Sequence, residues 1–185
     1  MNLEQLDRLL TAVAKKHRVD SFVVIGSLSV LGLVDARLIP EAMTVSTDVD
    51  AYPDADPARA FEMADDFGLG SAFEQEHGYY FDAVSPELPT LPRGWQERLI
   101  ARRLPGGTTA KFLEPHDAAI AKLARAEPKD LRWIRAGIGA SILSIATLEH
   151  RFRDTVFEDD QRERARVLLE GEAARTGLGR SRKRR

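Results

Sequence analysis

Two aspartates one residue apart are the clearest chemical feature of this 185-residue chain. Asp48 and Asp50 lie in the segment STDVDAYP, and successive side chains of a strand point to opposite faces. Both carboxylates would therefore share one face, with Val49 turned toward the core. Two carboxylates that close raise each other's pKa unless a cation lies between them, and Mg²⁺ takes oxygen ligands. The pair predicts a site that holds Mg²⁺ (or Mn²⁺) against a nucleoside triphosphate.

A glycine–serine turn supplies a complementary part. Gly26 and Ser27 follow the apolar run SFVVI at 21–25, which predicts a buried strand. Glycine lets a ligand approach the backbone closely, and a helix beginning after the turn would present free N–H groups to phosphate. Ser27 adds a hydroxyl donor. We therefore expect the turn to contact the triphosphate.

A third carboxylate is available at Asp82, in a strand predicted over 77–84. If that strand lies beside the strand of Asp48 and Asp50, Asp82 reaches the same metal ions or acts as general base toward an acceptor hydroxyl. The plainer alternative is an outward-facing surface charge. The order of strand, Gly-Ser turn, helix, strand with two aspartates and strand with one is more specific than any of its parts.

The elements that must position these residues follow from apolar periodicity and turn residues. Leucines and a valine at helical spacing predict an amphipathic helix over 3–17. The remaining predictions for the first part of the chain are a short helix over 27–33, a loop over 34–44, a strand over 45–51, a helix over 57–67, a turn over 68–71, a strand over 99–104 and a short strand before Pro115. From 116 to 174 the pattern is helical, with breaks at Pro128 and around 137–139.

These elements predict an α/β (α+β) fold, with a mixed sheet and flanking helices in a core at 1–114 and a C-terminal helical region at 115–174. The segment 175–185 has six Lys and Arg and no acids, so the rest of the chain carries −2 − 6 = −8. We expect this tail to be disordered and solvated; affinity for an anionic partner is the alternative. An acidic body does not attract nucleic acid through its overall field.

Composition excludes several kinds of site. The chain has no cysteine, which removes disulfides and thiolate chemistry, and its four histidines lack zinc-ligand spacing. A calcium loop beginning at Asp48 fails because Tyr52 and Pro53 occupy positions where it needs a ligand and a glycine. No window is apolar enough for a membrane span, and the charged N-terminus lacks a signal-peptide core, so we expect a cytoplasmic protein with no membrane partner.

Several segments of the sequence resemble those of a known family. The series VVIGS, STDVDAYP and FDAVSP resembles the nucleotidyltransferase superfamily that contains DNA polymerase β-like enzymes. The segment FLEPHDAAIAKLARAEPKDLRWI is similar to one in uncharacterised bacterial nucleotidyltransferase-like proteins of the DUF6036 type, which are related to abortive-infection and MenT-type toxins. The resemblance spans residues 20–150.

The resemblance implies a role for each matching residue. Gly26 and Ser27 would contact the triphosphate, and the catalytic metal ions would be held by Asp48, Asp50 and Asp82. Lys122 and Lys129 would neutralise phosphate charge, and Asp130 would position a lysine or the nucleotide. Ordinary solvated helix charge is the alternative for the lysines.

The resemblance also implies an activity. A nucleoside monophosphate would pass from an NTP to a hydroxyl acceptor, either RNA such as a tRNA end or a protein side chain, and an antitoxin would be a further partner. A nucleotide- or protein-binding module that keeps the fold without turnover is the alternative.

Three features around these residues each have two alternative interpretations. The gap from Ser27 to Asp48 is longer than is usual for the superfamily, so the intervening segment would either lie over the site or displace it. Trp95 would stack on a base or fix a loop to the core. A set of basic residues would line an acceptor groove or form a solvated face: Arg98, Arg102, Arg103 and Lys111.

Overall fold

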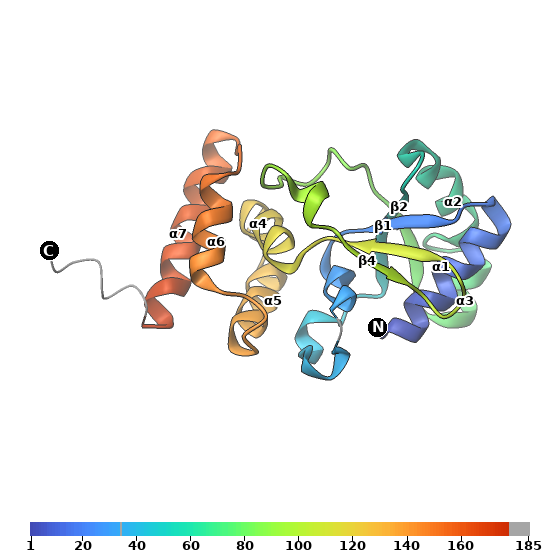
Figure 1. Ribbon diagram of the computed structural model, residues 1–185, viewed down its shortest axis with the longest axis horizontal. Coiled ribbons are helices and arrows are strands. Elements are labelled where there is room, and N and C mark those ends of the chain that lie inside the picture. The colour runs from blue at the N-terminus through green and yellow to red at the C-terminus, as the bar shows by residue number, and fades with distance from the viewer. Residues whose placement is uncertain (34, 178–185) are drawn as a thin grey trace, which may run out of the picture.

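A five-stranded mixed sheet forms the centre of the computed structural model, which describes residues 1–33 and 35–177 (Figure 1). The strand order is β3-β2-β1-β5-β4, with β1 parallel to β5 and antiparallel to β2. This arrangement confirms the predicted α/β fold class. The strands are β1 (Ser21–Val24), β2 (Asp48–Pro53), β3 (Tyr80–Ala83), β4 (Ile100–Arg103) and β5 (Thr109–Phe112).

Helices lie beside the sheet and at one end of it (Figure 1). The α-helices are α1 (Leu3–His17), α2 (Ala60–Phe67), α3 (Ala72–His77), α4 (Pro115–Arg125), α5 (Pro128–Gly139), α6 (Ile145–Arg153) and α7 (Asp159–Arg175). Short 3₁₀ helices are η1 (Ser27–Gly32), η2 (Ala36–Leu38), η3 (Glu41–Met43), η4 (Pro57–Arg59) and η5 (Trp95–Arg98). None of the described helices combines the length and the hydropathy that a membrane crossing would need.

The two faces of the sheet differ in chemistry. Val49 pairs with Phe81 and Val24 with Ala51, and these four side chains are 0% exposed on one face. The buried leucines of α1 belong to the same apolar cluster. Side chains alternate along a strand, so Asp48, Asp50 and Asp82 must lie on the opposite face.

Two predicted elements around the Gly-Ser turn and the aspartates needed correction. The segment after Gly26 is a six-residue 3₁₀ helix, η1, in place of an ordinary helix, so it offers only a weak N-terminal dipole. A Cβ on Gly32 would lie 2.4 Å from the Cβ of Phe112, and this close packing holds the turn against β5. The strand predicted over 45–51 is shifted to Asp48–Pro53, and Pro53 pairs with Phe22 of β1 at its end.

The strand predicted over 77–84 begins only at Tyr80. Residues before it form α3, which was missed: Ser71 caps its first turn, and Gly78 ends it at φ 76°. The loop predicted over 34–44 contains η2 and η3, and the helix predicted over 57–67 begins as η4.

The C-terminal helices pack around α4, which contacts α5, α6 and α7. Figure 1 shows α6 and α7 side by side at the end farthest from the sheet. The predicted break at Pro128 is present, and the break expected around 137–139 lies after Gly139, where Ser141 adopts φ 60°. A further break precedes α7, which ends at Arg175. Residues 178–185 of the predicted basic tail lie outside the described part of the chain.

Candidate active site

Three carboxylates converge on the polar face of the sheet. Asp50 of β2 pairs in register with Asp82 of β3, and Asp48 lies two residues earlier on the same face. One oxygen from each carboxylate lies within 4.8 Å of the others. Ser46 donates a hydrogen bond to Asp48 Oδ1, which orients that carboxylate. The donor set is all oxygen, which fits Mg²⁺ or Mn²⁺.

Crowding of negative charge perturbs this cluster. Burial, followed by the charges of Asp48 and Asp82, raises the pKa of Asp50 to about 7, although Lys122 and Arg125 oppose the change. Burial and Asp48 also raise the pKa of Asp82. The cluster therefore holds excess negative charge that a divalent cation would neutralise.

The Gly-Ser turn lies directly against these acids. Gly26 has φ 68° and ψ −152°, and a Cβ built on it would lie 1.9 Å from Asp50 Oδ2. The next residue, Ser27, accepts a hydrogen bond of 2.8 Å from Lys122 Nζ through its Oγ. The structure thus brings the turn, the acids and Lys122 into one site.

Lys122 belongs to a buried charge cluster at the end of α4. Its side chain is 5% exposed, and its Nζ lies 3.5 Å from Asp130 Oδ1. Arg125 donates to both oxygens of Asp130, at 2.9 and 2.7 Å. Burial alone would raise the pKa of Asp130, but hydrogen bonds from Arg125 and the charges of Lys122 and Arg125 hold it below its usual value. Burial lowers the pKa of Lys122 against the opposing effect of Asp130.

Lys129 lies outside this buried cluster. Its side chain is 65% exposed and its Nζ lies 3.3 Å from Glu127 Oε2. Lys129 nevertheless contributes to the wall of the adjoining cavity. The two lysines singled out from the sequence therefore occupy different environments, one buried and one at the rim.

A cavity of about 570 Å³ connects the acids to the basic residues. Its polar wall comes from β2, the Gly-Ser turn, α4, the start of α5 and α7. Its apolar wall includes Met43, Val45, Leu88 and Trp133. The charged residues that line it are Asp48, Asp50, Lys122, Arg125, Lys129 and Arg164.

The long segment between the turn and β2 forms one side of this cavity. Ala42, Met43, Val45 and Ser46 all line it, and the Met43 side chain is 0% exposed. Trp133 donates from its indole Nε1 to the carbonyl oxygen of Met43 at 3.1 Å. The segment therefore lies over the site and does not displace it.

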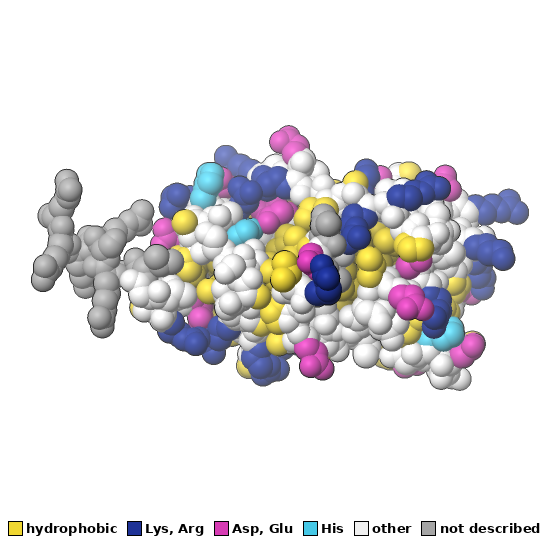
Figure 2. Space-filling model, turned by 60° about the horizontal axis from the view of Figure 1, so that its bottom comes forward, with side chains coloured by type: hydrophobic (Ala, Val, Ile, Leu, Met, Phe, Trp, Pro, Cys, Tyr) yellow, Lys and Arg dark blue, Asp and Glu magenta, His cyan; other side chains and the backbone are white. Residues whose placement is uncertain are grey.

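The basic residues suggested as an acceptor groove do not gather. Arg98 binds the buried carboxylate of Asp117, and Arg102 donates to the carbonyls of Leu31 and Leu33. Lys111 lies 2.7 Å from the carboxylate of Asp54. On the face shown in Figure 2, Lys and Arg side chains are scattered among Asp and Glu side chains. Arg98, Arg102 and Lys111 are therefore bound within the fold, which does not support the groove, and Trp95 packs against the core.

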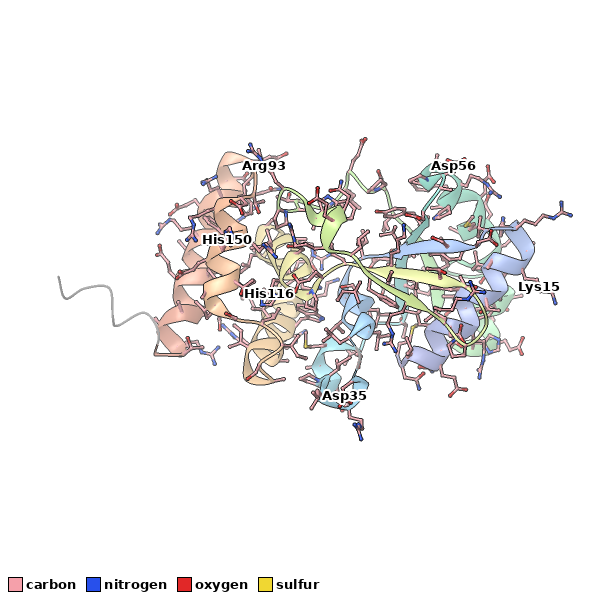
Figure 3. All side chains as sticks on the ribbon, in the orientation of Figure 1. Lys15, Asp35, Asp56, Arg93, His116 and His150 are labelled. Carbon is pink, nitrogen blue, oxygen red and sulfur yellow. The ribbon has the colours of Figure 1, made fainter. Side chains whose placement is uncertain are left out.

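Other acids and histidines do not join the candidate site. Asp54 is bound by Lys111 and by Ser21 Oγ, and Asp56 lies beside the α2 end of the molecule (Figure 3). His116 and His150 lie among the C-terminal helices in the same view. Among the described residues, the aspartate cluster is the group suited to a metal ion.

Four residues of the site were missed in the sequence. Arg125 had a local signal, since it lies one helical turn after Lys122 and five residues before Asp130. Trp133 resembled an ordinary core residue. Gln161 and Arg164 line the cavity from α7, and no local pattern connects them to Asp48 and Asp50, more than a hundred positions earlier.

Comparison with known proteins agrees with this geometry at the level of the family. A search of curated proteins and a search of solved structures each found no match. A family model described as "Nucleotidyltransferase of unknown function (DUF6036)" matches residues 1–174, which include every residue of the site described above. The match covers nearly the whole chain, and the chain therefore belongs to this nucleotidyltransferase family of unknown function.

Proposed function

We propose that the protein transfers a nucleoside monophosphate from an NTP to a hydroxyl acceptor, with Mg²⁺ or Mn²⁺ as cofactor. In this reaction the acceptor oxygen bonds to the α-phosphorus, the bond from that phosphorus to the bridging oxygen of the β-phosphate breaks, and pyrophosphate leaves. The observation that carries the proposal is one cavity lined by two carboxylates of the three-aspartate cluster and by four cationic side chains.

The carboxylates are suited to hold the divalent cation. Asp48 and Asp50 line the cavity, and Asp82 is the third member of the cluster. When bound, the cation would lower the pKa of the acceptor hydroxyl and neutralise charge on the leaving pyrophosphate. The closeness of the Gly26 backbone to Asp50 supports a triphosphate placed directly beside the metal site.

The cationic residues are suited to bind the polyphosphate. Lys122 Nζ is fixed by Ser27 and Asp130, so its charge is held in place before the substrate arrives. Arg125, Lys129 and Arg164 surround it in the cavity wall. Pre-positioned charge of this kind stabilises a transition state without the cost of reorganisation.

Asp82 is suited to receive the acceptor proton. It is partly exposed and does not line the cavity, so it is accessible beside the carboxylates that do. Burial and the neighbouring Asp48 raise its pKa in the metal-free protein, and a carboxylate beside the metal site is within reach of an acceptor hydroxyl bound there. We assign it the role of general base.

The proposed acceptor is the end of an RNA, such as a tRNA, or a protein side chain, as the resemblance to abortive-infection and MenT-type toxins suggests. In a toxin–antitoxin setting, expression of the wild-type protein would arrest growth and Asp48→Ala would relieve the arrest. An antitoxin would be identified by its ability to restore growth without loss of the protein.

The first experiment is a thermal shift with each of the four NTPs, with and without Mg²⁺ or Mn²⁺. A ligand at one hundred times its Kd stabilises the native state by about 2.7 kcal/mol, which raises the Tm of a chain this long by about 5–10 °C. We expect a metal-dependent rise for at least one NTP and no rise in Asp48→Ala/Asp50→Ala. Labelled NTP with RNA and protein fractions then identifies the acceptor.

Two results would change this proposal. The absence of a shift with every NTP would contradict nucleotide binding and favour a protein-binding module. A shift without labelled product, together with an Asp48→Ala variant that still captures its partner, would favour a nucleotide-binding module without turnover.

A further inference from the structure

Trp133 joins two separate walls of the cavity. Its indole Nε1 donates to the carbonyl oxygen of Ser27 at 3.2 Å and to that of Met43 at 3.1 Å. One carbonyl belongs to the Gly-Ser turn and the other to the segment that precedes β2. A single N–H group therefore fixes the spacing of two chain segments whose bonded residues are 16 positions apart in the sequence.

The same side chain also lies against the buried lysine. Lys122 Nζ lies 4.9 Å from the centre of the Trp133 ring, within the range of a cation–π contact. Lys122 in turn donates to Ser27 Oγ, so Ser27 is held by its carbonyl and by its hydroxyl. Trp133 is 2% exposed, which keeps water from competing for these contacts.

The helix that carries Trp133, α5, also packs against the segment that precedes β2 (residues 42–47), which forms the second wall of the cavity. Gly137 lies one turn further along α5, and a Cβ built on it would come within 3.1 Å of the terminal methyl of Met43. The wall is therefore held against α5 by side-chain packing as well as by the indole hydrogen bond.

We propose that Trp133 is a positioning residue that makes the Gly-Ser turn, the 42–47 wall and Lys122 move as one unit when an NTP enters. The indole contacts carry the coupling of these segments, and the effect of that coupling on NTP binding rests on the proposed function. Without the indole N–H, the turn and the wall would fluctuate independently, and an NTP would have to order both on binding.

The test compares Trp133→Phe with Trp95→Phe. Phenylalanine keeps an aromatic ring beside Lys122 and removes the shared donor together with part of the indole volume, a loss of volume that Trp95→Phe reproduces. Trp95 is the other tryptophan of the chain and does not line the cavity, so its substitution is a matched control. Hydrogen exchange measures the amides of 27–33 and 42–47 in both variants without any ligand, and titration with Mg²⁺ and the NTP that gives the largest thermal shift measures binding.

We expect Trp133→Phe to raise exchange in both segments together and to weaken NTP binding about tenfold, the effect of losing roughly one hydrogen bond. We expect neither change in Trp95→Phe. In the Trp95→Phe protein the remaining indole is Trp133, so its fluorescence should change when Mg²⁺ and NTP are added.

Each other outcome has a definite meaning. Unchanged exchange, or a rise in one segment alone, would overturn the coupling whatever the binding result. A rise in both segments with unaltered NTP affinity would overturn the positioning role. A rise in both segments in a protein whose wild type binds no NTP would leave the coupling intact and remove the proposed function.

Discussion

Gly26 and Asp50 are packed so closely that any side chain at position 26 would collide with the carboxylate. A Cβ on Gly26 would lie 1.9 Å from Asp50 Oδ2 and 2.7 Å from its Cγ. The backbone angles of Gly26, φ 68° and ψ −152°, also belong to a region that only glycine adopts readily. The turn and the carboxylate therefore depend on each other: moving either one displaces the other.

Gly26→Ala should abolish the metal-dependent response to NTP. The new methyl group must push Asp50 out of the carboxylate cluster, and backbone strain adds about 1–3 kcal/mol of destabilisation. We expect a Tm lower by about 2–12 °C and no further rise with Mg²⁺ and NTP. Differential scanning fluorimetry with and without ligands measures both effects.

Gly78→Ala is the matched control for this substitution. Gly78 has φ 76°, but a Cβ there meets nothing within 4 Å, so alanine brings strain without a collision. We expect a moderate loss of Tm and a normal response to Mg²⁺ and NTP. Equal responses in the two variants would show that the Gly26–Asp50 contact does not matter for binding.

The elevated pKa of Asp50 predicts an unusual dependence of stability on pH. The folded protein without metal keeps a proton on Asp50 up to about pH 7, whereas the unfolded chain releases it near its ordinary value of 3.8. Because the folded state binds more protons in this window, stability of the metal-free protein should fall as pH rises from about 4 to 7. Asp50→Asn should remove this loss and stabilise the metal-free protein at pH 8 by at most about 4 kcal/mol.

Metal binding should show the opposite trend with pH. A cation must displace the proton of Asp50, so the affinity for Mn²⁺ should rise as pH increases toward 7 and level off above it. Calorimetric titration in two buffers of different ionisation enthalpy measures the released proton directly. The exposed Asp65→Asn variant is the control and should match wild type; an Mn²⁺ affinity independent of pH would contradict the assigned cause.

The sequence predicted that Asp48 and Asp50 share one face, and it made the approach of Asp82 conditional on the pairing of the two strands, which the structure provides. Asp48 and Asp50 share a face because they are two residues apart, and the parallel pairing of β2 with β3 brings Asp82 beside Asp50. The shift of β2 from 45–51 to 48–53 left this relationship intact, because both aspartates stay within the strand.

What could not be predicted depends on contacts between distant segments. The last residue of η1, Gly32, packs closely on Phe112, eighty positions away, and this contact is not visible in the local sequence. The local sequence around Trp133 is typical of a core residue. Its role arises from hydrogen bonds to the carbonyl oxygens of Ser27, 106 positions earlier, and of Met43, 90 positions earlier. Arg164 enters the site only because α7 packs on α4.

Asp130→Asn should destabilise the protein because it removes the negative charge shared by Lys122 and Arg125. The carboxylate is 0% exposed, and its loss removes the counter-charge that lies 3.5 Å from the buried Nζ of Lys122. Arg125 is 48% exposed and partly compensated by water, which limits the cost to about 2–3 kcal/mol. Thermal unfolding at pH 7 measures the change, with Tm lower by about 4–12 °C.

The pH dependence of this difference provides its control. The pKa of Asp130 is depressed in the folded state, so the stabilisation is present above pH 3.8 and is lost as pH falls through the lower folded value. Wild type and Asp130→Asn should therefore converge in strongly acidic buffer. A gap that persists there would indicate a packing defect and not a lost ion pair.

Arg164→Ala should weaken binding of the polyphosphate without affecting the metal site. Arg164 lines the cavity from α7, and its ion-pair partner is the neighbouring Asp160 at 3.3 Å, an exposed pair that contributes little to stability. Loss of one charge-assisted contact to phosphate should raise the Kd for NTP about tenfold, with the Tm of the free protein unchanged within about 1 °C. Arg162→Ala is the control, since Arg162 lies on the same helix but faces the ring of Phe152 at 5.5 Å. Isothermal titration measures the Kd with Mg²⁺ and NTP and, separately, with Mg²⁺ and pyrophosphate. If Arg164 contacts the β- or γ-phosphate, Arg164→Ala should raise both Kd values by the same factor. Equal Kd values for Arg164→Ala and Arg162→Ala would show that Arg164 does not belong to the site.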